Sequence, residues 1–252
     1  MRKIVLLLLS LLFLIVSADA QTTSSKNKKK KPRITAKAWL IADSNGKILK
    51  GSNVEDVHSI ASVTKLMTAI VVLDAKQKLD EKITSSTRRQ EMQIALVHSV
   101  NHAADNLCNS YPGGYEACIK AMNVKALKLK MLNTSFKDAT GLSEENVSTA
   151  SDLIKLVAAA QYYPEIVKAA QTQTVKIQIR KRWFIFRNTN PIIGRKYKFI
   201  VSKTGFTQAA GGCIVLMIDS EVGKRIIVVL GSKNAHTRIP EAEFIIKSAK
   251  LN

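Results

Sequence analysis

Residues 62–75 read Ser-Val-Thr-Lys-Leu-Met-Thr-Ala-Ile-Val-Val-Leu-Asp-Ala, and they set the architecture expected for the whole chain. The stretch is apolar on nearly every side, and its polar residues gather at the start. A helix that is hydrophobic all round is buried inside a domain rather than lying on its surface. We therefore expect a central helix that presents Ser62 and Lys65 in its first turn.

The segments on either side of this stretch change from strand patterns to helix patterns and back. Residues 36–42 have a strand pattern, Asn45-Gly46 is typical of a tight turn, and residues 47–50 form the returning strand. Helices are predicted at residues 88–98, 103–110, 115–130 and 151–162, strands at 174–179, 183–186, 198–203, 213–218 and 225–230, and a closing helix at 240–250. This order predicts an α+β fold, with a mostly antiparallel sheet flanked by helices and a helical cluster inserted.

The composition is that of a globular protein with a large positive charge. The 252 residues are 46% hydrophobic and carry 39 Lys and Arg against 19 Asp and Glu, a net charge of +20. The apolar content is enough for a sizeable core, and the charge attracts anionic partners. No Cys-x-x-Cys pair occurs, which argues against a zinc ribbon or a thioredoxin-type redox site.

The first twenty residues predict export. Arg2 and Lys3 precede an apolar stretch at residues 4–16, and Ala18-Asp19-Ala20 offers a small-x-small cleavage site. The stretch has the length of a signal-peptide core and is shorter than the ~20 residues of a membrane span. We predict a signal peptide at 1–20, with an uncleaved membrane anchor as the alternative, and a place in the periplasm or cell-wall space. Export also argues against a nucleic-acid partner for the positive charge.

Residues 21–33 are predicted to form a basic, flexible tether ahead of a domain at 34–252. Six positive charges lie between Lys26 and Arg33, and this tether contains no large apolar side chain. Such a run is typical of a solvated spacer. The alternative is electrostatic contact with an anionic wall or membrane surface.

Three short motifs bring together residues that suit nucleophilic catalysis. Ser-x-x-Lys occurs three times, but only Ser62…Lys65 opens a buried helix, where the spacing puts hydroxyl and amine on one face. The copies at Ser25 and Ser44 fall in the tether and in the hairpin turn. Read alone, Ser62 is equally well a helix cap and Lys65 a solvated side chain.

The other two motifs are Ser-x-Asn and Lys-Thr-Gly. Of three Ser-x-Asn copies, only Ser99-Val100-Asn101 lies at a junction between two predicted helices. Lys203-Thr204-Gly205 occurs once and ends an apolar strand, so Lys203 can present a charge at a strand edge. Gly205 allows a ligand to approach the backbone closely.

In this order the motifs resemble the Ser-x-x-Lys, Ser-x-Asn, Lys-Thr-Gly set of penicillin-binding proteins and serine β-lactamases. The chain resembles the low-mass penicillin-binding proteins, which are serine D-alanyl-D-alanine carboxypeptidases, and most closely their endopeptidase-like subgroup. The likeness spans about residues 36–232 and includes Tyr111-Pro112-Gly113-Gly114, Thr140-Gly141-Leu142 and Phe186-Arg187-Asn188-Thr189-Asn190. It implies a β-lactamase/transpeptidase-like fold.

The resemblance also implies the chemistry. Ser62 would attack a D-Ala peptide bond of a peptidoglycan stem peptide and form an acyl-enzyme, and β-lactams would acylate it covalently. Lys65 would act as the base, with its pKa lowered by partial desolvation and by the second cation, Lys203. Ser99 would pass the proton to the leaving amine, and Asn101 would hold Lys65 and the substrate.

The same resemblance assigns the remaining site residues. Lys203 and Thr204 would bind the carboxylate of the departing D-residue beside Gly205, and the N–H groups of Ser62 and Phe206 would stabilise the oxyanion. The mechanism requires no metal and no cofactor. The activity expected is cross-link endopeptidase or carboxypeptidase, and the subgroup likeness favours the endopeptidase.

Two departures from the family pattern keep alternatives open. The segment at residues 79–90 is shorter than relatives usually have, and Val100 occupies a position that is often acidic, glycine or polar. A non-catalytic wall-binding homologue is therefore the rival hypothesis. A β-lactamase is a third, with Glu144 or Glu145 as a deacylation base.

The histidines and cysteines give weaker signals. His98 and His102 are four apart, but Ser99 stands where a zincin has its glutamate base, so no metal site is expected. Cys108 and Cys118 could form a disulfide after export, although an intervening helix–loop–helix could hold them apart. Cys213 is expected to be a small core residue.

Overall fold

The computed structural model describes residues 34–195 and 197–249. The predicted signal peptide and tether lie outside the described residues. Strands are β1 Ala38–Asp43, β2 Ile48–Ser52, β3 His58–Ser59, β4 Val147–Ser148, β5 Thr174–Ile179, β6 Arg182–Arg187, β7 Lys198–Thr207, β8 Gly211–Asp219 and β9 Arg225–Ser232. Helices are α1 Lys65–Asp74, α2 Arg88–Gln93, α3 Asn101–Asn109, α4 Gly114–Lys128, α5 Ala150–Ala160, α6 Pro164–Gln171 and α7 Arg238–Ser248, with η1 Ala61–Thr64 and η2 Ile94–His98.

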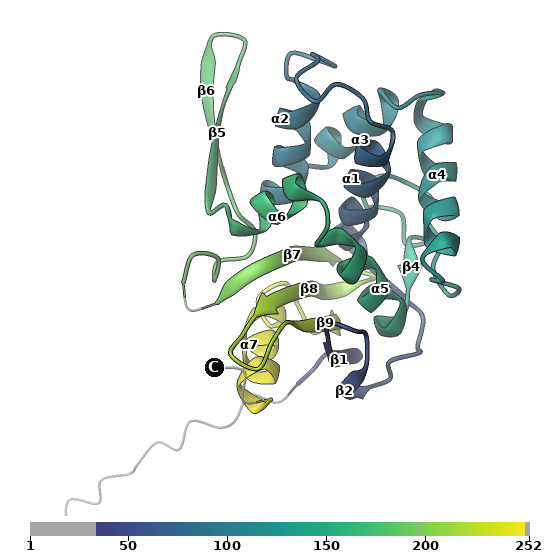
Figure 1. Cartoon of the computed structure of the whole chain (residues 1–252), viewed down its shortest axis with the longest axis vertical. Helices are drawn as coiled ribbons and strands as arrows, with labels where there is room; N and C mark the ends of the chain where they lie inside the picture. The colour runs from purple at the N-terminus through teal and green to yellow at the C-terminus, as the bar shows by residue number, and fades with distance from the viewer. Residues whose placement is uncertain (1–33, 196, 250–252) are drawn as a thin grey trace, which may run out of the picture. The chain divides into compact units, whose positions relative to one another are not determined.

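The main sheet has five strands in the order β2-β1-β9-β8-β7, and every neighbouring pair is antiparallel. The helices between β2 and β7 form a cluster over one face, and α7 covers the other (Figure 1). The predicted α+β architecture with an inserted helical cluster is confirmed.

Strands β8 and β9 are almost continuously apolar because both faces of the sheet are covered. In β8, Val215 and Met217 pack with the helical cluster, whereas Ile214 and Leu216 pack with α7. Alternate side chains of a strand point to opposite faces, so this single strand contributes to both cores.

Helix α1 occupies the central position that its sequence predicts, and every residue from Lys65 to Val72 is buried. The polar start of the stretch takes a different form from the one predicted, because residues 61–64 form a 3-10 turn before the α-helix begins. This turn places Ser62 at the end of the central helix, next to β7.

Several element bounds differ from the predictions. Helix α6 was not predicted, because Pro164 follows a helix pattern and looks like a break; proline at the first helical position is well tolerated. Helix α3 begins at Asn101 rather than at residue 103. Strand β7 continues to Thr207, so Lys203-Thr204-Gly205 lies inside the strand and not at its end.

Candidate active site

Ser62 and Lys65 lie on one face of the turn that leads into α1, as their spacing predicts. Lys65 Nζ is 2.8 Å from Ser62 Oγ, 2.8 Å from Asn101 Oδ1 and 2.6 Å from the carbonyl oxygen of Thr140. The Lys65 side chain is only 1% exposed. The oxygen atoms of Asn101 and Thr140 thus hold the amine against the Ser62 hydroxyl group.

The environment of Lys65 favours the neutral amine. Burial lowers the pKa of Lys65 to about 8, although the carboxylates of Asp138 and Asp105 act in the opposite direction. The sequence prediction of a lowered pKa agrees with this direction, but burial, and not the second cation, is the main cause. At a pKa of about 8, roughly a tenth of the amine is neutral at pH 7 and free to accept a proton, and this share grows as pH rises.

Ser99 is placed by an unusual piece of helix. Residues 94–98 form a π-helical turn, and Ser99 then adopts a left-handed backbone with φ 64° before α3 begins at Asn101. A π-bulge is rare and is found frequently at functional sites. After this change of direction Asn101 contacts Lys65 of the central helix and Ser99 contacts Lys203 of β7.

Lys203 reaches the site from β7. Its Nζ is 2.8 Å from Ser99 Oγ and 2.9 Å from the carbonyl oxygen of Thr204. Burial holds the pKa of Lys203 well below its usual range, and the cations Lys65 and Arg238 add to this effect. The site therefore contains two amine–hydroxyl pairs, Lys65 with Ser62 and Lys203 with Ser99, and the charge of Lys65 acts on Lys203.

Two glycines allow the backbones to meet at the nucleophile. A Cβ on Gly205 would lie 2.9 Å from Ser62 N, and a Cβ on Gly141 would lie 1.9 Å from the carbonyl oxygen of Ala61. Gly141 also has φ +84°, which favours glycine. Any side chain at either position would push β7 or the 138–143 loop away from Ser62.

Asp138 organises that loop. It accepts hydrogen bonds of 2.6 Å from the backbone N–H groups of Thr140, Gly141 and Ser143. Burial alone would raise the pKa of Asp138, but these hydrogen bonds outweigh it and hold the pKa below its usual value. The ionised carboxylate thus fixes the Thr140 carbonyl group that contacts Lys65.

These residues line a groove of about 260 Å³. Its walls are Ser62, Ser99, Asn101, Gly141, Leu142, Thr189, Thr204, Gly205, Phe206, Thr207 and Arg238. The structure therefore brings the predicted residues together: six line the groove, while Lys65 and Lys203 lie buried behind it, each bonded to one of its serines. Three motifs that are far apart in the chain converge on one hydroxyl group.

Arg238 and Thr189 are groove residues that the sequence analysis did not select. The Thr189 hydroxyl group is 2.6 Å from that of Thr204. Arg238 lies on α7, and its Nε and Nη1 atoms are buried without a hydrogen-bond partner among the described residues. Burial lowers the pKa of Arg238. Thr189 belongs to the stretch at residues 186–190 that resembles the family. No local sequence pattern marks Arg238, because only the fold brings α7 to the groove.

The remaining candidate residues, which are a histidine, a cysteine and two glutamates, lie outside the groove. His98 Nδ1 is 2.7 Å from the carbonyl oxygen of Arg187. Cys213 is buried in β8, as predicted, and burial raises the pKa of its thiol to about 11. Glu144 and Glu145 are exposed, do not line the groove, and Glu145 pairs with Lys137.

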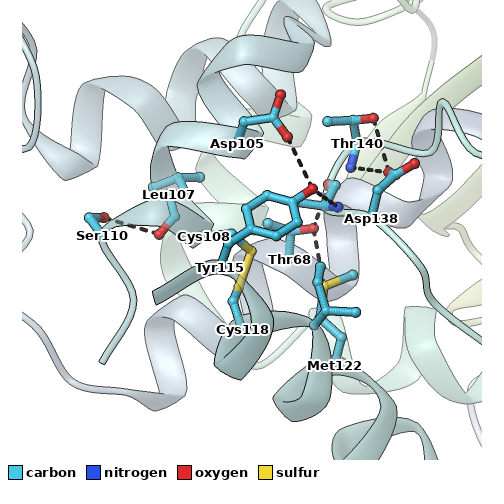
Figure 2. Close-up of a disulfide and its surroundings, with 12 residues drawn as sticks. Thr68, Asp105, Leu107, Cys108, Ser110, Tyr115, Cys118, Met122, Asp138 and Thr140 are labelled. Atoms are coloured by element: carbon cyan, nitrogen blue, oxygen red, sulfur yellow. Dashed lines mark hydrogen bonds between the residues drawn. A yellow bond between two sulfur atoms is a disulfide. The ribbon is translucent and has the colours of Figure 1, made fainter. Parts of the chain in front are cut away.

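A disulfide joins Cys108 of α3 to Cys118 of α4, with the Cα atoms 5.3 Å apart. The sequence left open whether these cysteines would bond or be held apart; they bond because α3 and α4 pack directly against each other. Figure 2 shows Tyr115 beside the disulfide, where its hydroxyl group donates to Asp105 and accepts from the Ala139 N–H group. The disulfide thus ties α3 to α4, and α4 contacts the Asp138 loop through Tyr115.

None of the helices in the described part of the chain combines the length and the apolar character needed to cross a bilayer.

Known proteins with similar sequences and structures agree with this geometry. The family model for D-alanyl-D-alanine carboxypeptidase matches residues 25–92 and 81–234. The chain is 37% identical to a D-alanyl-D-alanine endopeptidase of Escherichia coli over 236 residues, which covers 84% of this chain and 76% of that protein. It is 38% identical to a D-alanyl-D-alanine endopeptidase of Pseudomonas aeruginosa over 227 residues, covering 81% and 73%.

Solved structures show the same fold. The Streptomyces K15 DD-transpeptidase superposes with a TM-score of 0.80 at 25% identity, covering 86% of this chain and 97% of that chain. Penicillin-binding protein D2 of Listeria monocytogenes in its ampicillin-bound form gives a TM-score of 0.76 at 29% identity, covering 85% and 97%. With its motifs gathered around Ser62, the chain belongs to the D-alanyl-D-alanine carboxypeptidase family of low-mass penicillin-binding serine peptidases.

Proposed function

We propose that this protein hydrolyses D-Ala peptide bonds of peptidoglycan through a Ser62 acyl-enzyme. The observation that carries the proposal is the 2.8 Å contact between the buried Lys65 amine and the Ser62 hydroxyl group at the edge of the groove. A serine hydroxyl group becomes a nucleophile when a neighbouring base accepts its proton. Lys65 is suited to that task because burial keeps a share of its amine neutral.

The proposed reaction has two balanced steps. In the first, Lys65 accepts the hydroxyl proton as Ser62 Oγ bonds to the carbonyl carbon; the peptide C–N bond then breaks as Ser99 gives its hydroxyl proton to the leaving amine and takes a proton back from Lys65, which is neutral again. In the second, Lys65 accepts a proton from water as the water oxygen bonds to the ester carbon; the bond from that carbon to Ser62 Oγ then breaks, the proton returns to Ser62, and the acid is released. The N–H groups of Ser62 and Phe206 are the proposed donors to the oxyanion in both steps.

Positive charge at one end of the groove suits the carboxylate of the departing D-residue. Lys203, Thr204 and Arg238 are the proposed ligands, and the unpartnered nitrogens of Arg238 favour an anion over a neutral group. A planar guanidinium binds a carboxylate through two parallel hydrogen bonds. Asn101 bonds Lys65 and is proposed to orient the peptide as well.

Between the two activities of the family, we favour cross-link endopeptidase over terminal carboxypeptidase. The two relatives at 37% and 38% identity are both called endopeptidases. The exposed positions of Glu144 and Glu145 argue against a β-lactamase, since neither can activate water from outside the groove.

We also propose that residues 1–20 direct export to the periplasm or cell-wall space, and that the cations between Lys26 and Arg33 contact an anionic wall or membrane surface. The charge run and the apolar stretch before it support both proposals. The catalytic domain is proposed to begin at residue 34.

A fluorescent penicillin tests the nucleophile. We expect the wild type to be labelled and Ser62→Ala to show no labelling. Ser44→Ala is the matched control, because Ser44…Lys47 repeats the Ser-x-x-Lys pattern in an exposed turn and should label as the wild type does. A folded wild-type protein that resists labelling at high reagent would disprove the enzymatic proposal.

Mass spectrometry of muropeptides incubated with the protein identifies the reaction. Conversion of cross-linked dimers to monomers indicates the endopeptidase, loss of a single D-Ala indicates the carboxypeptidase, and no change supports the non-catalytic wall-binding homologue. Ser62→Ala provides the blank for all three results.

A further inference from the structure

A separate two-stranded hairpin, β5–β6, extends away from the main sheet (Figure 1). Its inner face contacts the domain: Ile177 is buried in the main core, and Phe186 packs beside it, with its ring 5.6 Å from that of His98. Its outer face carries Trp183, which is 66% exposed, and Ile185, which is 60% exposed. Large apolar side chains with this exposure on one strand face suggest a surface that meets a partner.

The outer face is also strongly cationic. Lys176 lies directly opposite Ile185, and Arg187 follows Ile185 on the same face. Arg180 and Lys181 form the exposed turn between the strands. Residues 166–218 contain ten Lys and Arg and no Asp or Glu, so the hairpin lies in a long stretch of sequence whose charged residues are all cations. An anionic partner is favoured by this charge.

The hairpin is physically continuous with the catalytic groove. At its base, the Arg187 carbonyl oxygen contacts His98, the residue before Ser99, and the Thr189 N–H group donates to the Val97 carbonyl oxygen over 3.0 Å. Thr189 itself lines the groove. At about 3.4 Å per residue, the six residues from Thr189 to Trp183 extend up to about 20 Å from the groove.

We propose that the outer face of the β5–β6 hairpin is a docking surface for the cross-linked cell-wall polymer on which the groove acts. This inference rests on the proposed function and adds to it a second binding surface outside the groove. Sugar rings of the polymer pack on Trp183 and Ile185, and free carboxylates of its peptides pair with Lys176 and Arg187. A polymer held there reaches the groove with its cross-link, whereas a short free peptide gains nothing from it.

The arrangement of the side chains favours a polymer over a lipid bilayer. A hairpin that enters a membrane interface needs its apolar side chains at the tip or along one apolar face. Here the tip is Arg180-Lys181, and the outer face of β6 runs from Trp183 through Ile185 to Arg187 toward the groove, with Lys176 of β5 opposite Ile185. This row matches an extended, charged polymer.

Binding to purified wall sacculi tests the proposal in a Ser62→Ala background, where the polymer is not cut. The test variant is Trp183→Ser with Lys176→Gln. The matched control is Leu49→Ser with Lys50→Gln, which removes one exposed apolar residue and one cation from the edge strand β2. We expect the hairpin variant to bind sacculi about tenfold more weakly and the β2 variant to bind as its parent does.

Equal binding of the hairpin and β2 variants, with unchanged thermal unfolding, would overturn the proposal. Vesicles containing phosphatidylglycerol form the second arm: a loss of vesicle binding without a loss of sacculus binding would assign the hairpin to lipid and also overturn it. The proposed function is judged separately, by penicillin labelling of the wild type. An unlabelled wild type whose sacculus binding still depends on Trp183 would keep the docking surface and remove the peptidase.

Discussion

Among single residues, Lys65 matters most for the site, because its amine is buried although it can carry a charge. Lys65 contacts three oxygen atoms, and one of them belongs to the nucleophile. The Asp138 loop supplies another, so a carboxylate that never touches Ser62 still fixes the base. Lys65 is expected to act as the proton acceptor only in its neutral form.

The first prediction concerns pH. Because burial lowers the pKa of Lys65 to about 8, the neutral fraction grows as pH rises, and the second-order rate of penicillin acylation should increase through about pH 8 and then level off. Labelling rates between about pH 6 and pH 9.5 measure this. The Lys65→Arg variant stays protonated throughout this range, so its acylation rate should be at least about a hundredfold lower than that of the wild type at every pH. A rate that does not change over this range would contradict the assignment of Lys65 as the base.

At the scale of elements, the site depends on how rigidly α3 is held, since Asn101 is its first residue. The disulfide from Cys108 anchors the far end of α3 to α4, and Tyr115 of α4 contacts the Asp138 loop. The π-turn before Ser99 is held from the other side by the base of the β5–β6 hairpin. The loop bearing Ser99 and Asn101 is thus fixed between two elements that contain no predicted catalytic residue.

The second prediction concerns this disulfide. Closing a loop of about ten residues restricts the unfolded chain, so Cys108→Ala with Cys118→Ala should lower the free energy of unfolding by about 3 kcal/mol. Urea denaturation measures the change, and the reduced wild type should lose a similar amount. Cys213→Ala is the control, because its unfolding should remain sensitive to the reductant. Identical stability of oxidised and reduced wild type would refute a structural role for the bond.

At the scale of the whole molecule, the net charge of +20 acts over a longer range than any contact in the groove. Cations on the hairpin are exposed to solvent and to salt, whereas Lys65 and Lys203 are buried. Salt should therefore separate the two kinds of interaction, since exposed charges are screened much more strongly than buried ones.

The third prediction uses this difference. Association of Ser62→Ala with sacculi should weaken roughly tenfold as ionic strength rises from about 0.03 M to about 0.3 M, because the Debye length shortens to less than 10 Å. Penicillin acylation of the wild type over the same range should change much less. Replacing the six cations between Lys26 and Arg33 by Gln should remove part of the salt dependence. Salt-independent association would argue against an electrostatic contribution to wall binding.

Elements whose pattern is local in the chain could be predicted from the amino-acid sequence. The apolar stretch at residues 62–75 identified the buried helix, the three-residue spacing put Ser62 and Lys65 on one face, and short apolar runs marked strands of the sheet such as β8 and β9. Helix α6 was missed, because an X-Pro junction allows either a break or a first helical turn and only packing decides between them.

Contacts between side chains far apart in the sequence depend on the fold. The contact between Lys203 and Ser99 joins residues 104 positions apart, Arg238 enters the groove from a helix in no motif, and the Cys108–Cys118 bond depends on how closely α3 and α4 pack. When two residues lie three or four positions apart in a helix, the helix geometry itself fixes the distance between their side chains. When they lie farther apart in the sequence, that distance depends on how the intervening elements pack, and it cannot be predicted from composition or periodicity.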